Sequence, residues 1–155
     1  MSALDTCVHS VVRTGILLHL QGLGPTVEAQ LPVSADLYRR WYGGDISALN
    51  EIELALRLAH GRWTMQFSKD IADAVRLISA RPLWLSAAAG DTGQAAHLKT
   101  SLDVIVRRRN QIAHESDFDP STGTKWPIDS ALAVAAISLL EERGKAVVAH
   151  VAAEY

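Results

Sequence analysis

Residues 98–114 read LKTSLDVIVRRRNQIAH and have the apolar spacing of a long amphipathic helix. Leu98, Leu102 and Ile105 recur at intervals of four and three residues, which places them on one helix face. Continuing this spacing leads to Arg109, so we expect that arginine to point inward or into an interface. A charged side chain in such a position needs a physical reason, because burying an unpaired charge is costly. The residues around Arg109 are therefore the first candidate for a functional site.

Asn110 and His114 lie one helical turn apart and share a face of this predicted helix. His114 can serve as a general acid or base, because imidazole titrates near neutral pH. Arg109 offers a planar fork for phosphate oxygens, and Asn110 can orient either neighbour by hydrogen bonding. These three side chains fit a metal-free ribonuclease, which needs a proton acceptor, a proton donor and a cation at the phosphate.

Structural roles would explain the same residues. An inward Arg109 could pair with a buried carboxylate, for which Asp5 or Asp73 could serve. His114 could instead cap the end of its helix. Residues five apart in a helix differ in direction by about 140°, so Arg109 and His114 of one chain cannot both point at one phosphate. Either the helix loosens at its end or a second copy of the chain completes the site.

Composition limits the other classes of function. The chain has 155 residues, 48% of them hydrophobic, which predicts a single domain over residues 1–155 with a real core. A net charge of -2 excludes a broadly basic nucleic-acid surface. Arg107 and Arg108 are most simply a solvated face, but they add positive potential beside Arg109 and are the candidate RNA-binding residues.

Cofactors and membrane insertion are not indicated. The single Cys7 provides no disulfide, which fits a reducing cytoplasm. No two histidines are three or four residues apart, so we expect no metal site and no cofactor. The longest apolar run stops at His19, far short of the roughly 20 residues of a membrane helix.

The pattern along the chain predicts an all-α protein, because strand signals are scarce and the one alternating segment is interrupted by Pro25 and Pro32. Ser68 is the expected N-cap of its helix, and Asp129 or Ser130 caps the last one. We expect residues 85–93 to be a small-residue linker and 117–127 a polar loop. The predicted helices cover residues 2–21, 37–42, 46–60, 68–78, 94–114 and the segment after 130.

Residues 109–114 resemble the R-x4-6-H signature of the HEPN superfamily, including the polar residue that usually follows the arginine. The longer string 102–115, followed by Asp117, Asp119-Pro120 and residues 126–129, resembles the subgroup called RiboL-PSP-HEPN. Residues 2–9 are similar to the first helix of that subgroup, and residues 65–67 with 71–75 are similar to its middle. The resemblance covers nearly the whole chain.

The resemblance implies an up-and-down bundle of about four to five helices that pairs as a homodimer, with Arg109 and His114 of both chains in a cleft at the two-fold axis. Many HEPN proteins are metal-independent endoribonucleases that leave 2′,3′-cyclic phosphate ends in toxin–antitoxin, defence or RNA-processing settings. Others are catalytically inactive modules for RNA binding, protein interaction or dimerisation, which is the alternative function. RNA, a second copy, and an antitoxin or regulatory protein are the implied partners.

Two departures from the family are visible. The first helix of the family begins further upstream, so the resemblance implies a shortened N-terminal helix here. His114 is followed by Glu115-Ser116 and not by the x-Tyr of the subgroup that a nucleotidyltransferase antitoxin regulates, so that particular partner is not expected.

Overall fold

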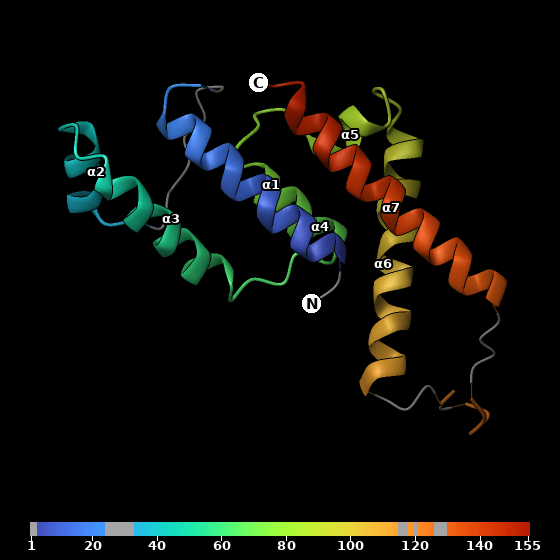
Figure 1. Ribbon diagram of the computed structural model, residues 1–155. Helices are drawn as coiled ribbons and strands as arrows, with labels where there is room; N and C mark the ends of the chain where they lie inside the picture. The colour runs from blue at the N-terminus through green and yellow to red at the C-terminus, as the bar shows by residue number, and fades with distance from the viewer. Residues whose placement is uncertain (1–2, 24–32, 115–117, 120, 126–129) are drawn as a thin grey trace.

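The computed structural model describes residues 3–23, 33–114, 118–119, 121–125 and 130–155, and within them it is an all-α helical bundle (Figure 1). The helices are α1 (Ala3–Leu20), α2 (Ala35–Tyr42), α3 (Ser47–His60), α4 (Ser68–Val75), α5 (Leu83–Ala87), α6 (Thr92–His114) and α7 (Ser130–Ala152). α1, α3, α6 and α7 are the long ones. An isolated bridge between Phe118 and Lys125 is the extent of β pairing in the described residues.

The core lies around α1, which packs against α3, α4 and α7, while α6 packs against α4, α5 and α7. Apolar side chains at helical spacing on α1 face these neighbours and are removed from water, which is the main stabilising contribution to such a bundle. The fully buried members are Val8, Val12, Ile16, Ile52, Leu56, Met65, Ile71, Val75, Ile78, Leu102 and Val147.

The beginning of α4 differs from the sequence prediction. Phe67 is the N-cap, and Ser68 is the first helical residue. The carboxylate of Asp103 on α6 accepts hydrogen bonds from the Ser68 backbone N–H at 2.8 Å and from its Oγ at 3.0 Å. A carboxylate from another helix thus satisfies a donor that a local cap would normally satisfy. The prediction that Ser68 itself caps α4 is wrong.

The predicted linker at residues 85–93 begins instead as a short helix, α5. Pro82 precedes it, and proline has a fixed φ that suits a helix start. Leu83 and Trp84 are buried in the core, and the Trp84 Nε1–H donates to the Ser68 carbonyl at 2.8 Å. Burial of these two side chains therefore orders a stretch whose small residues indicated a loop.

The ends of α6 and α7 that meet the connection between them extend away from the rest of the bundle (Figure 1). No residue from 130 to 142 of α7 is buried, whereas Arg143, Val147, His150 and Val151 further along are. Residues 107–113 of α6 are likewise at least partly exposed. Among the described residues, no helix combines the length and apolar character needed to cross a membrane.

Candidate functional site

The arginine cluster lies on the C-terminal part of α6. Arg107 and Arg109 are exposed in the single chain, while Arg108 is half-buried. The Arg109 Nη1–H donates to Asn110 Oδ1 at 3.0 Å, so the amide holds the guanidinium in place without neutralising its charge. Arg109 does not point into the core, and Arg108 is less solvated than the sequence predicted.

The buried row of α6 explains this difference. Leu98, Leu102 and Val106 are buried at successive intervals of four residues, and Ile105 is only half-buried. The next position on that row is Asn110, which is half-buried, and not Arg109. The expectation for Arg109 followed from a step of three residues after Leu102. The buried row instead takes a step of four residues, which leads to Asn110.

Neither carboxylate considered as a partner for Arg109 contacts it. Asp5 is buried and its Oδ1 accepts the Met65 N–H at 2.7 Å. Asp73 accepts from Lys69 Nζ at 2.6 Å. Among the described residues the buried arginine is Arg143 on α7, which sequence analysis did not single out.

Asn110 and His114 both belong to α6, whose backbone is helical as far as His114. The side chain of His114 lies outside what the structure describes, as do residues 115–117, 120 and 126–129 that contribute to the family resemblance. The backbone of α6 is α-helical up to His114, so the described part of this helix does not loosen at its end. Positions 109 and 114 therefore still differ in direction by about 140° around the helix, so one chain does not aim both side chains at one phosphate.

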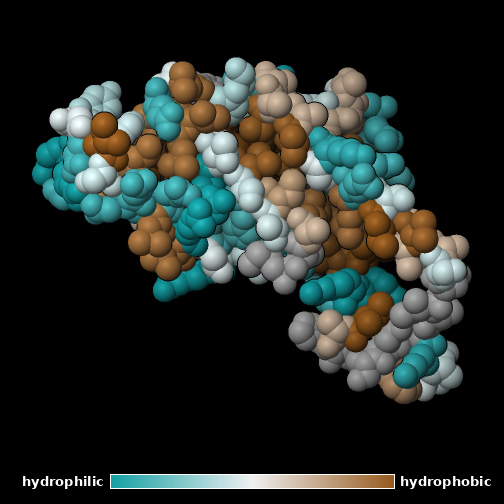
Figure 2. Space-filling view, viewed as in Figure 1, coloured by the Kyte–Doolittle hydropathy of each residue, from teal (hydrophilic) through white to brown (hydrophobic). Residues whose placement is uncertain are grey.

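Large apolar side chains are exposed on α6, the helix that carries the arginines, and on the first half of α7. On α6, Val104 is 58% exposed, and on α7, Val134 and Ile137 are 61% and 65% exposed. Ile112 and Leu132 belong to the same set. We call this set the α6–α7 face, and Figure 2 shows apolar residues over α7. Exposed apolar side chains that form a contiguous patch are typical of surfaces that bind a partner.

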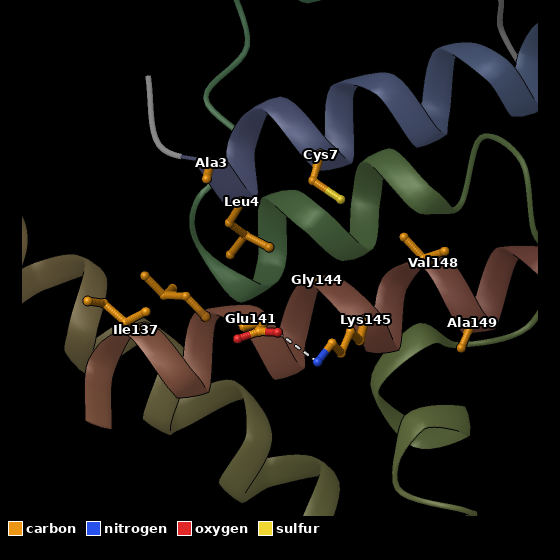
Figure 3. Close-up of a pocket in the computed structure, with 10 residues that line it drawn as sticks. Ala3, Leu4, Cys7, Ile137, Glu141, Gly144, Lys145, Val148 and Ala149 are labelled. Carbon is orange, nitrogen blue, oxygen red and sulfur yellow. Dashed lines mark ion pairs between the residues drawn. The ribbon is translucent and has the colours of Figure 1, made fainter. Parts of the chain in front are cut away.

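An apolar groove of about 710 Å³ lies between α1 and α7 (Figure 3). Ile137 of the α6–α7 face lines one end of it, and Leu4 and Cys7 contribute from α1. Its charged lining residues, Glu141 and Lys145, form an ion pair at 2.7 Å. Because the charged lining residues that the structure describes compensate each other, the groove suits an apolar partner better than a polar substrate.

Two further polar clusters were not found from the sequence. Ser79 Oγ lies 2.9 Å from His150 Nε2 and 3.1 Å from Glu154 Oε1, an arrangement reminiscent of a nucleophile beside a base. Ser79 is completely buried, so no substrate reaches it, and the cluster fixes the end of α7. The other cluster joins His9 and His60, whose ring centroids are 6.3 Å apart. Both connect residues more than 50 positions apart, which local spacing cannot reveal.

Within the part of the chain that the structure describes, no group of three or more His, Cys, Asp or Glu side chains is placed to hold a metal ion. Comparison with protein-family models, with curated proteins and with solved structures found no match.

Proposed function

We propose that the chain is a metal-independent endoribonuclease of the HEPN type, which acts as a homodimer on single-stranded or looped RNA and leaves 2′,3′-cyclic phosphate ends. The observation that carries the proposal is the exposed Arg109 guanidinium, held by Asn110 at 3.0 Å on the helix that ends at His114. Among the described residues no carboxylate pairs with Arg109, so its charge is available to a phosphate. A toxin–antitoxin, defence or RNA-processing role follows from the family resemblance.

The reaction requires balanced proton transfer. The ribose 2′-hydroxyl attacks the neighbouring phosphorus, so that a bond from the 2′-oxygen forms as the bond to the 5′-oxygen breaks. A base takes the proton of the 2′-hydroxyl, and an acid gives one to the leaving 5′-oxygen. His114 is proposed for proton transfer, Arg109 for stabilising the charged phosphate oxygens, and Asn110 for positioning. Arg107 and Arg108 would attract neighbouring phosphates.

A second copy of the chain is part of the proposal. One regular helix cannot aim residues 109 and 114 at one phosphate, but two copies of α6 meeting at a two-fold axis can each supply one of them. The α6–α7 face supports this arrangement, because its apolar side chains would leave water when the copies meet. Two such copies also supply two His114 imidazoles, one for each proton.

The test is cleavage of single-stranded RNA by purified protein with a chelator present, with product ends identified by mass spectrometry. We expect cyclic phosphate ends, and we expect His114→Ala to lower the rate by roughly a hundredfold or more, the scale of losing a general acid or base. Arg109→Ala should also abolish cleavage. His97→Ala, an exposed change on the same helix, is the matched control and should cleave normally.

Circular dichroism and light scattering on each variant separate chemistry from folding. If His114→Ala remains folded and dimeric yet inactive, the histidine acts in the reaction. Cleavage that survives in both folded variants, or that stops when the wild type receives chelator, would contradict the proposal.

A catalytically inactive module is the second candidate, and the α6–α7 face favours it. Exposed apolar side chains such as Val134 and Ile137 offer contacts to RNA or to a regulatory protein such as an antitoxin. The module predicts that the wild type retains RNA without cutting it. Replacing Arg107 and Arg108 by alanine would then weaken retention for all RNA sequences alike.

A further inference from the structure

A groove of about 430 Å³ lies between α4, α5 and α6, on a part of the molecule that the proposed reaction does not use. Among the described residues its lining contains the cations Lys69, Arg76, Arg81 and Lys99 and one acid, Asp73. The whole chain has a net charge of -2, so this excess of positive charge is local. Such a concentration of cations in a concave site attracts anions.

The charges in the groove are only partly compensated. Asp73 Oδ2 accepts from Lys69 Nζ at 2.6 Å, and Asp73 Oδ1 lies 3.8 Å from Arg76 Nη1. One carboxylate therefore brings two cations together. Arg81 is paired with Glu154, whereas exposed Lys99 forms no ion pair with any residue that the structure describes. Lys69 and Arg76 thus share the single negative charge of Asp73, and the Lys99 ammonium group has no carboxylate partner among the described residues.

The floor of the groove is apolar and fixed in place. Pro82, Leu83 and Trp84 line it, and the Trp84 Nε1–H is engaged by the Ser68 carbonyl at 2.8 Å. Sites for small organic ligands usually enclose about 300–1,000 Å³, and this groove falls within that range. A cationic rim over an apolar floor suits a phosphate that carries a larger organic group.

We propose that this groove binds a nucleotide, with its phosphate between Lys69, Arg76 and Lys99 and its sugar or base against Pro82 and Leu83. The site is separate from the candidate active site, because Lys99 and Arg109 are ten residues apart, or about 15 Å along the helix axis. It therefore does not depend on the proposed ribonuclease activity. The nucleotide is either free or one unit of an RNA strand, since both present the same phosphate.

The test uses AMP as the probe, titrated into the wild-type chain at low ionic strength by isothermal calorimetry. Lys99→Ala should weaken binding roughly tenfold, the scale of one charge-assisted hydrogen bond. Lys145→Ala is the matched control: it removes the same charge from an exposed position on α7 outside the groove, and affinity should not change. Asp73→Asn removes the competing carboxylate and should strengthen binding severalfold.

Three further probes define the ligand. Adenosine should bind much more weakly than AMP because it lacks the phosphate, and inorganic phosphate should be weaker because it lacks the apolar contact. A short single-stranded RNA, made uncleavable by 2′-O-methylation, identifies the source: if RNA binds and AMP does not, and Lys99→Ala weakens the RNA, the nucleotide belongs to a strand. Binding of neither AMP nor RNA, or equal affinity in the Lys99→Ala and Lys145→Ala proteins, would overturn the proposal. Each of these outcomes is independent of whether RNA is cut.

Discussion

His60 is buried at the end of α3, where its ring stacks on Trp63 with 4.7 Å between centroids. Both ring nitrogens are buried, and neither has a hydrogen-bond partner among the described residues. Burial lowers the pKa of His60 below its ordinary value of 6.5, and the nearby His9 and Arg13 lower the pKa further. The unfolded chain therefore takes up a proton at a higher pH than the folded chain does, so acid favours unfolding.

We expect His60 to leave the melting temperature unaffected above about pH 7 and to lower it as the pH falls below about 6.5. His60→Phe keeps a ring against Trp63 but cannot be protonated, so it should flatten this dependence. The measurement is thermal unfolding followed by circular dichroism between about pH 7.5 and about pH 5. The melting temperature of the His60→Phe protein should still fall slightly at low pH, because burial also lowers the pKa of His150.

His97→Ala provides the control for the pH experiment, because His97 is exposed on α6 and should leave the profile unchanged. A His60→Phe profile as steep as that of the wild type would show that the acid sensitivity arises from other groups.

At the scale of the helices, Gly15 sets how closely α1 approaches the turn after α4. A Cβ added at Gly15 would lie 2.7 Å from Ile78 Cδ1 and 3.1 Å from Ile78 Cβ. Gly15→Ala should therefore lower the free energy of unfolding by about 1 kcal/mol, since overpacking of about 1–3 kcal/mol exceeds the helix propensity gained. Urea denaturation measures this change.

Gly144→Ala is the matched substitution on α7. Its Cβ would meet only Leu4 Cδ1, at 3.8 Å, which is an ordinary contact. Here the gain in helix propensity is unopposed, and the free energy of unfolding should rise by about 0.5–1 kcal/mol. Effects of the same sign at both glycines would contradict the packing argument.

The long helices could be predicted from the sequence because their apolar residues repeat at helical spacing. The cap of α4 could not be predicted, because it comes from Asp103, which is 35 positions away in the sequence. That contact exists only after α6 packs against α4. For the same reason α5 was missed, since burial of Leu83 and Trp84 outweighs the small residues that follow.

The candidate site was located by local pattern, and only part of it is described. Asn110 and His114 lie on one helix, as the pattern predicts. The pattern directed Arg109 inward or into an interface, and the inward orientation is wrong, because the helix buries a row at four-residue steps that leads to Asn110 instead. The cations of the α4–α6 groove come from α4, the following turn and α6, so no sequence window contains Lys69 together with Lys99.

At the scale of the whole molecule, the proposed homodimer places the α6–α7 face at the contact between copies. Ile137 is 65% exposed and lines the apolar groove, so Ile137→Glu puts a charge into the proposed interface without disturbing the core. We expect the wild type to have twice the chain mass of 16.8 kDa by light scattering at micromolar concentration, and the variant to have the chain mass.

Leu54→Glu is the control for dimerisation, because Leu54 is 57% exposed on α3, outside the α6–α7 face. It should remain dimeric, and both variants should keep the helical circular dichroism spectrum. A wild type of single-chain mass, or an Ile137→Glu protein that stays dimeric, would count against this interface.

The uneven attachment of α7 has a consequence for the exchange of its backbone amide hydrogens with water. Near its C-terminal end the helix is held by buried Val147 and by His150, which contacts Ser79 at 2.9 Å, whereas residues 130–142 have no buried side chain. Local opening costs less where fewer contacts are lost. Deuterium should therefore enter the first half of α7 much faster than the second, and association of two copies through the α6–α7 face should slow exchange in that first half alone.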